Sequence, residues 1–232
     1  MPVLSSLAYF ATMVRRMEIS YLGHSSFRIR TSLGFVVTDP YDPKMVGLKY
    51  SGVEADIVTV SHDHADHDQH QGVKGVKRVV SGPGEYEIAG ISIIGLPSFH
   101  DDKNGELRGK NTIYVIEAEG LRLCHLGDLG HILSQEQVQE IGEIDVLMIP
   151  VGGGGFTIGA KEASQVVMDI EPKIVIPMHY ALEGLNQEVF SKLASVEDFL
   201  KEISLPTERL PKLSIKKEEL LEESKAVVLE AK

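Results

Sequence analysis

Short apolar runs, several of them alternating with polar residues, recur along most of the chain. The runs at 17–23 and 27–40 alternate and are rich in β-branched side chains, which predicts two strands joined by a turn. The run ADIVTVS, at 55–61, is nearly continuous and of strand length, which predicts a buried strand. Further strands are predicted within 76–82, 86–100, 111–128, 145–152 and 172–180, with a closing strand near the carboxyl terminus.

Helical periodicity is confined to about 134–141, 160–170 and 187–203. This strand-rich pattern predicts an α/β (α+β) chain with two packed sheets flanked by helices. We find no internal repeat or linker, so residues 17–232 are predicted to form one domain. Residues 1–16 are interpreted as an N-terminal extension, loose or a mis-called start, with an amphipathic surface helix as the alternative. A secretory signal does not fit, because Arg15 and Arg16 follow the apolar stretch.

Composition narrows the classes of partner. The 23 Lys and Arg residues against 34 Asp and Glu residues give a net charge of −11. Without a basic tract, this balance disfavours nucleic acid and anionic membranes as partners. A single cysteine, Cys124, allows no disulfide within the chain and suits a reducing compartment. We therefore expect a cytoplasmic protein with a small-molecule substrate, and we leave a homo-oligomer open.

The densest polar cluster is SHDHADHDQH at 61–70. His62 and His64 stand two residues apart at a strand end, so both can face one ion. Asp66 and His67 follow where the chain is expected to turn into a short helix, so their carboxylate and imidazole would be directed at a second position. Imidazole with carboxylate is a ligand set that zinc, iron and manganese accept. The alternative, a solvated polar turn, leaves the strand-end histidines elsewhere in the chain unexplained.

Three distant residues also end apolar runs, where side chains emerge at a sheet edge: His100, Asp128 and His179. Alternation places Asp128 on the same strand face as Cys124, whereas His125 faces the other way. We therefore interpret His125 as a structural residue or an outer partner of a ligand, and Cys124 as a small buried apolar residue. Within the polar cluster, Asp63, Asp68 and His70 are likewise assigned to the turn or its surface.

The ordered set HDHADH, His100, GD at Asp128 and His179 resembles the metallo-β-lactamase superfamily. The segments GHSSFRI, TDP, PVGGGGFTIGAKEA and PMHY resemble its branch of small single-domain metal-dependent hydrolases, which includes L-ascorbate-6-phosphate lactonase-like proteins. This resemblance implies a four-layer αββα sandwich of two mixed sheets flanked by helices, with a metal site at one edge.

The resemblance also implies a ligand set. His62, His64 and His100 would hold one metal. Asp66, His67 and His179 would hold the second, with Asp128 bridging the two. The expected cofactors are two divalent ions, zinc first, with manganese or iron as alternatives. Such a pair brings the pKa of a shared water toward about 7 and polarises the substrate. The candidate catalytic residues are Asp66, as base or orienter, and His179.

Other residues are candidates for contact with substrate or with a ligand: His24, His131 and Tyr180. Glycines 152–155 are expected to bring the backbone close to the site, and the polar loop 99–112 could act as a lid or specificity element. The resulting hypothesis is a metal-dependent hydrolase whose bridging hydroxide attacks a small ester, lactone or phosphorylated metabolite. The alternatives are a phosphodiesterase or nuclease, or an iron-dependent oxidoreductase on the same site.

Overall fold

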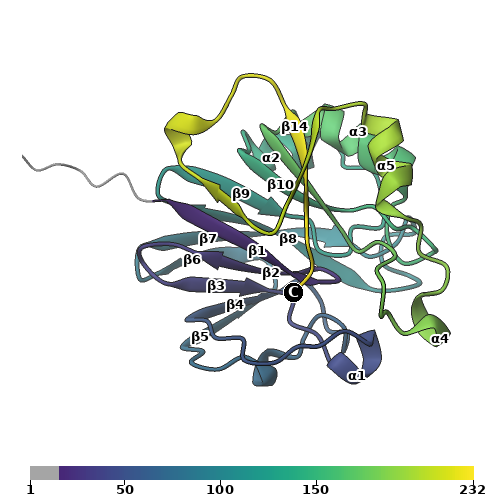
Figure 1. Cartoon of the computed structure of the whole chain (residues 1–232), viewed down its shortest axis with the longest axis horizontal. Coiled ribbons are helices and arrows are strands. Elements are labelled where there is room, and N and C mark those ends of the chain that lie inside the picture. Colours follow the sequence, from purple (N-terminus) through teal and green to yellow (C-terminus); the bar gives the residue numbers. More distant parts are fainter. Residues whose placement is uncertain (1–15) are drawn as a thin grey trace, which may run out of the picture.

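Two β-sheets pack face to face in the computed structural model, which describes residues 16–232 (Figure 1). The predicted extension over 1–16 lies outside the described residues, apart from Arg16. The six-stranded sheet has the order β13-β1-β2-β3-β4-β5. Its strands are β1 (Met17–Gly23), β2 (Ser26–Arg30), β3 (Phe35–Thr38), β4 (Ile57–Val60), β5 (Arg78–Ser81) and β13 (Leu213–Ile215).

The eight-stranded sheet has the order β12-β14-β11-β10-β9-β8-β7-β6. Its strands are β6 (Gly84–Ile88), β7 (Ile91–Phe99), β8 (Lys110–Ala118), β9 (Leu121–His125), β10 (Val146–Pro150), β11 (Ile174–Met178), β12 (Thr207–Leu210) and β14 (Lys225–Leu229). Both sheets contain parallel and antiparallel pairs. The prediction of two mixed sheets flanked by helices is therefore confirmed.

Helices α2 (Gln135–Ile141), α3 (Ala160–Ile170) and α5 (Val196–Ile203) lie outside the eight-stranded sheet (Figure 1). The short helices α1 (Pro43–Val46) and α4 (Gln187–Phe190) lie at one end of the sandwich, and two 3-10 turns cover His70–Gly72 and Lys217–Glu219. Helix α3 buries an apolar stripe at helical spacing: Ala163, Val166, Val167 and Ile170. In the described part of the chain, no helix is both long and apolar enough to span a membrane.

Alternation along the strands of the six-stranded sheet creates two cores. One face of this sheet contributes to the main core between the sheets through Tyr21, Val36 and Ile57. The neighbouring residues Leu22, Val37 and Val58 point to the opposite face, where a second apolar cluster includes Val53, Ala55 and Val73. Both faces of this sheet are therefore buried, which explains the nearly continuous apolar sequence of β4.

The predicted helix over 187–203 is wrong in one respect, because the structure divides it into α4 and α5. The backbone between them turns away from helical geometry and makes long-range hydrogen bonds. The Ala194 N–H donates to the Gly152 carbonyl (2.8 Å), and the Ala194 carbonyl accepts from Ala181 (2.9 Å). These tertiary bonds are invisible to local periodicity, and they join this turn to the glycine-rich segment.

Candidate metal centre

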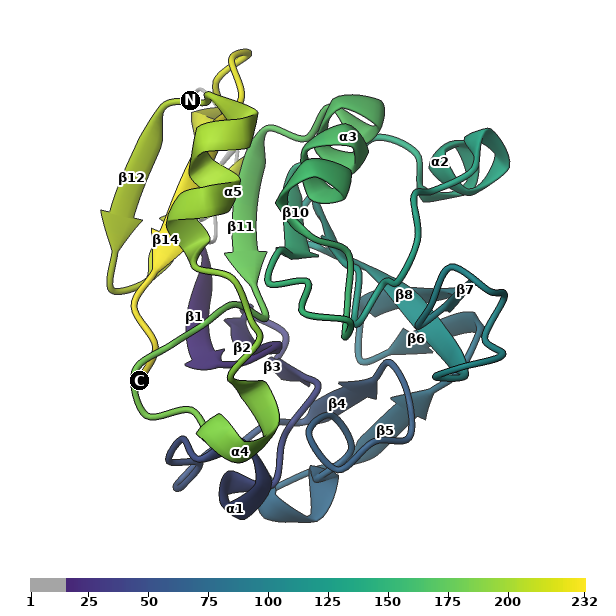
Figure 2. The ribbon, with the colours of Figure 1, turned by 90° about the vertical axis from the view of Figure 1, so that its right-hand side faces the viewer.

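Polar side chains follow the carboxyl ends of strands from both sheets. His24 follows β1, Asp39 follows β3, His100 follows β7 and His179 follows β11, while the cluster at 61–67 follows β4. Asp128 lies three residues after the end of β9. These strand ends meet at one end of the sandwich, which faces the viewer in Figure 2. The topology thus gathers residues from across the sequence at one place.

His62, His64 and His100 form what we call the histidine cluster. Each offers a ring nitrogen, and the three nitrogens lie within 4.8 Å of one another. A tight turn presents the first two rings, since the N–H groups of His67 and Asp68 both donate to the His64 carbonyl. His62 and His100 are buried, whereas His64 is half-buried. This arrangement matches the predicted first ligand set and leaves one of its members open to solvent.

His24, Asp66, His67 and His179 form the mixed cluster, and their ligand atoms also lie within 4.8 Å of one another. Three of these residues are the predicted second ligand set. His24 was predicted as a contact of substrate or ligand, and its Nε2 lies 3.2 Å from Oδ2 of Asp66. The geometry therefore allows His24 either to ligate a metal or to fix the Asp66 carboxylate.

Asp128 lies between the two clusters. Its Oδ2 is 3.1 Å from Nε2 of His67 and 3.2 Å from Nε2 of His179 in the mixed cluster. The same oxygen is 3.4 Å from Nε2 of His100 in the histidine cluster. Ligand atoms of one tetrahedral zinc ion, each at roughly 2.1 Å, stand about 3.4 Å apart. These separations fit a carboxylate that shares an ion with its neighbours on both sides.

The protonation states of most of these residues suit cation binding, whereas His67 favours its charged form. Burial keeps the pKa of His62 and His100 below the usual value and lowers the pKa of His24 to about 4, which favours neutral imidazoles. Burial opposes the charge on Asp128, but His179 and His67 outweigh it and hold the pKa of this carboxyl well below its usual range. Burial also opposes the charged form of His67, yet Asp128 and Asp66 raise its pKa well above the ordinary value.

Buried nitrogens without hydrogen bonds provide an independent test of the site. Among the described residues, Nε2 of His62, His67 and His179 is buried and makes no hydrogen bond of good geometry, although Asp128 Oδ2 lies 3.1 and 3.2 Å from the latter two. Buried polar atoms are normally paired, because an unpaired one loses its hydration without compensation. Each of these nitrogens is part of a candidate ligand set. A divalent cation would satisfy them, and the histidine and aspartate donors suit zinc.

Asp39 is a buried residue of the site that the list of candidates from the sequence omitted. Its Oδ2 lies 2.9 Å from Nδ1 of His67 and accepts a hydrogen bond from Ser61 Oγ (2.6 Å). Ser61 Oγ is in turn 2.9 Å from Nδ1 of His62. One buried carboxylate therefore orients imidazoles of both clusters, a common arrangement behind metal-binding histidines. Asp39 directly follows the run FVVT of β3, so the strand-end signal could have found it.

Left-handed backbone conformations occur at three residues of the site. The φ angles are +54° at His24, +38° at Asp39 and +52° at His179. Non-glycine residues adopt this region at a cost that the surrounding structure must offset. At His24 the offset is visible, because its carbonyl accepts hydrogen bonds from the His179 N–H (2.8 Å) and the Tyr21 hydroxyl (2.7 Å). This conformation couples the ends of β1 and β11.

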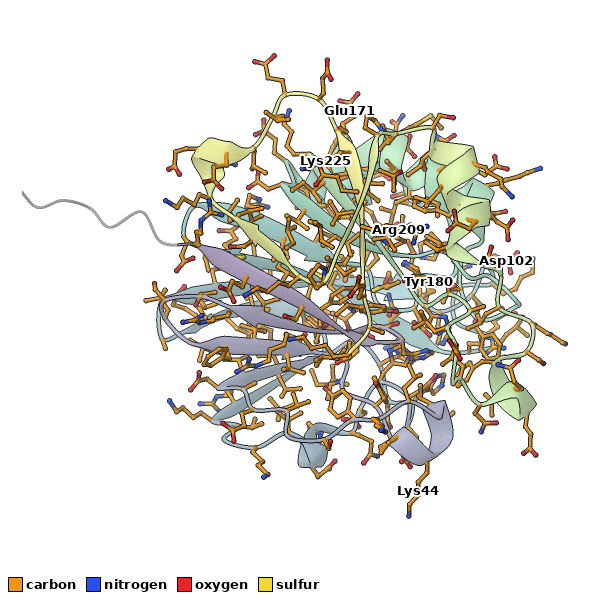
Figure 3. The ribbon with its side chains drawn as sticks, viewed as in Figure 1. Lys44, Asp102, Glu171, Tyr180, Arg209 and Lys225 are labelled. Atoms are coloured by element: carbon orange, nitrogen blue, oxygen red, sulfur yellow. The ribbon has the colours of Figure 1, made fainter. Side chains whose placement is uncertain are left out.

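Several candidates lie outside the two clusters. His125 is buried and bonds to the Ser25 carbonyl (2.8 Å), and Cys124 is buried in the core, as predicted for both. His131 uses its two ring nitrogens on the main chain of Phe99 and Ile132. Tyr180 packs in the main core near Tyr21, and burial raises its pKa to about 12 (Figure 3). Neither His131 nor Tyr180 is therefore part of the two clusters of candidate ligands.

The remaining acidic and basic residues of the polar cluster face outward. Asp63 is exposed, and Asp68 pairs with His70 at 2.9 Å while both are half-buried.

Behind the mixed cluster, Phe190 packs 4.9 Å from the His24 ring. Gly152 passes so close to the His179 carbonyl that a Cβ would lie 2.1 Å from it. The predicted close approach of this glycine segment is therefore present, directly behind a candidate ligand.

Sequence comparisons agree with this geometry. The sequence model described as "Beta-lactamase superfamily domain" matches residues 18–179. A UPF0173 metal-dependent hydrolase of Methanopyrus kandleri is 31% identical over 196 residues, which cover 71% of this chain and 84% of the relative. A protein of the same name from Thermococcus onnurineus is 29% identical over 194 residues, with the same coverage.

Solved structures share the fold. A candidate Zn-dependent hydrolase of the metallo-β-lactamase superfamily from Thermotoga maritima is 42% identical, with a TM-score of 0.77 over 93% of this chain and 100% of that chain. Igni18, a metallo hydrolase from Ignicoccus hospitalis, has a TM-score of 0.67 at 19% identity, over 93% of this chain and 95% of that chain. The second similarity bears on the fold alone.

Proposed function

The chain belongs to the metallo-β-lactamase superfamily, in the UPF0173 family of metal-dependent hydrolases, and we propose that it uses two divalent ions to hydrolyse a small ester, lactone or phosphorylated metabolite. The ligand assignment, the use of two ions and the substrate class are parts of this proposal. The charge balance of the chain supports a small-molecule substrate over a nucleic acid.

One observation carries the proposal. Asp128 Oδ2 lies 3.1 to 3.4 Å from imidazoles of both clusters. His62, His64 and His100 would hold one ion, and Asp66, His67 and His179 the other, with Asp128 shared. Zinc is our first choice because these donors suit it and because the Thermotoga maritima protein is described as a candidate Zn-dependent hydrolase. Manganese and iron remain the alternatives to be tested.

Two bound cations would supply a water of lowered pKa and a positive charge beside the substrate's carbonyl or phosphoryl oxygen. Asp66 is suited to orient that water by accepting a hydrogen bond at a carboxylate oxygen, because His67 and the hydrogen bond to His24 hold its pKa below the ordinary value against the effect of burial and keep it ionised. Asp39 and Ser61 hold the imidazoles of His67 and His62 in place. Phe190 keeps an apolar wall beside His24 and His179.

The test is a panel of lactones, thioesters, phosphate monoesters and diesters, and RNA, assayed with zinc, manganese and iron. We expect turnover of at least one small substrate class, and a loss of at least roughly a thousandfold in Asp128→Ala because both ions lose a shared ligand. Metal content, measured by mass spectrometry, should fall in parallel.

Asp169→Ala is the matched control, since Asp169 is an exposed aspartate on α3. It should retain both metal and activity. Turnover of RNA alone would replace the proposal with the nuclease alternative, and turnover that needs iron and an electron donor would replace it with the oxidoreductase. Full activity in metal-depleted Asp128→Ala would refute the use of this site altogether.

A further inference from the structure

A cavity of about 440 Å³ borders the histidine cluster. One side is formed by residues 61–64, which include His62 and His64. Residues 81–83, residues 108–110 and Thr112 also line the cavity. The volume is in the range of small-molecule sites. A substrate in this cavity would lie beside the more open of the two metal clusters.

Arg108 lines this cavity and lies in a loop that is held by internal hydrogen bonds. The carboxylate of Asp101 accepts four backbone hydrogen bonds, and the residue is only 7% exposed. Oδ1 accepts from Lys103 (2.8 Å) and Gly105 (2.9 Å), and Oδ2 from Leu107 (3.0 Å) and Arg108 itself (2.7 Å). This internal bonding suits the specificity element predicted for the loop better than the lid.

The Arg108 side chain is also held. Its guanidinium carbon lies 4.8 Å from the centre of the Phe156 ring, in a cation–π contact. Phe156 lies in the glycine-rich segment, and its ring is 6.2 Å from that of His179. The contact therefore connects the loop after His100 with the segment behind the mixed cluster, and it restricts the guanidinium before any ligand binds.

The lining of the cavity carries more basic than acidic side chains, whereas the whole protein is acidic. The chain carries a net charge of −11, yet Arg108 and Lys110 both line this cavity, and Asp63 is the acidic residue in its lining. Over residues 16–232, Arg108 forms no ion pair with a carboxylate. Stacking on Phe156 occupies the flat face of the guanidinium and leaves its N–H edge for another acceptor.

We propose that Arg108, supported by Lys110, binds an anionic group of the substrate, so that this hydrolase acts on carboxylate- or phosphate-bearing molecules in preference to neutral ones. The planar fork of arginine matches the paired oxygens of either group. This inference rests on the proposed function for the reaction, but the binding of an anion beside the histidine cluster can be measured without any turnover.

The binding test titrates the metal-loaded protein with inorganic phosphate and, separately, with succinate, by calorimetry. We expect the affinity to fall at least about tenfold in Arg108→Gln, because a charge-assisted hydrogen bond is lost. Arg108→Lys should recover part of the loss through its charge alone. A loss confined to phosphate would identify a phosphate-bearing substrate, and a loss confined to succinate a carboxylate-bearing one.

Arg28→Gln is the matched control, since Arg28 also stacks on a phenylalanine, 4.0 Å from the Phe35 ring, but lines a different cavity. It should bind both anions like the unaltered protein, and thermal unfolding should show that all three variants are folded. Affinities for both anions within twofold of the unaltered protein in Arg108→Gln would overturn the inference.

The kinetic test compares a neutral ester with its carboxylated or phosphorylated counterpart. The ratio of kcat/KM for the anionic over the neutral ester should fall at least about tenfold in Arg108→Gln, mainly through KM for the anionic one. An unchanged ratio would also overturn the inference. If no substrate of the panel is hydrolysed but anion binding depends on Arg108, the proposed function fails while the anion site stands.

Discussion

The two ligand clusters differ in charge and in burial. The histidine cluster offers only imidazole nitrogens, and His64 is half-buried at the edge of a cavity. The mixed cluster contains the Asp66 carboxylate, its residues are all buried, and Asp39 supports His67 from behind. A carboxylate attracts a cation more strongly where water is excluded. Under the proposed function, the mixed cluster is therefore suited to retention of its ion and the histidine cluster to access by substrate.

Replacing one candidate ligand in each cluster should give the largest effects and tests whether the two clusters differ in role. Asp66→Asn removes the negative charge of the mixed cluster without changing the shape of the side chain. We expect a loss of activity of roughly a thousandfold and the loss of one metal equivalent, because a buried cation keeps only the shared charge of Asp128. His64→Gln should cost roughly ten- to a hundredfold, since water can replace a half-buried ligand. Metal analysis and kcat/KM measure both effects, and equal losses would show that the clusters are not specialised.

Asp39→Asn gives the next largest effect. Loss of the carboxylate weakens the orientation of His67 directly and that of His62 through Ser61. We expect the affinity for metal to fall roughly ten- to a hundredfold, as is typical for partners behind metal ligands. Competition with a chromogenic chelator measures this change. Asp56→Asn offers a control, because Asp56 also accepts a backbone hydrogen bond, from Phe35, but lies away from both clusters. Unchanged metal affinity in Asp39→Asn would remove Asp39 from the site.

The smallest effect concerns the loop beside the histidine cluster. Burial opposes ionisation of Asp101, but four backbone N–H donors outweigh it and lower the pKa of Asp101 to about 2. Because the pKa is depressed in the folded protein, the order of the loop should be complete above the usual aspartate pKa of about 4 and lost as pH falls toward about 2. Hydrogen exchange at Lys103, Gly105, Leu107 and Arg108 should follow this course.

Asp101→Asn extends the same test to neutral pH. The amide keeps one good acceptor oxygen in place of two, so exchange at these four residues should speed up while the protein remains folded. KM should rise severalfold for an anionic substrate, because Arg108 is no longer fixed. Exchange rates equal to those of the unaltered protein would mean that the loop is ordered by other contacts. In that case the access side of the site would not depend on Asp101.

Strand-end positions were predictable from the sequence because they depend on local alternation. His62, His64, His100, Asp128 and His179 each come at the end of an apolar run, and the structure gathers all of them. Their division between two ions came from a family resemblance, since periodicity alone carries no distances. Asp39 carried the same strand-end signal and was missed. Its partnership with His67 becomes visible only when β3 and β4 pair in parallel.

The strand-rich class, the chemical nature of the candidate ligands and most of their positions could be predicted, because they follow from residue type and from the period of two along a strand. Contacts between residues that are distant in the sequence became visible only in the tertiary structure. His24 approaches Asp66 to 3.2 Å, and Arg108 contacts Phe156, although the two residues of each pair lie far apart in the chain. The break between α4 and α5 likewise depends on contacts with distant segments. Such contacts depend on the order of strands in each sheet and on how the two sheets pack, and no local pattern specifies either.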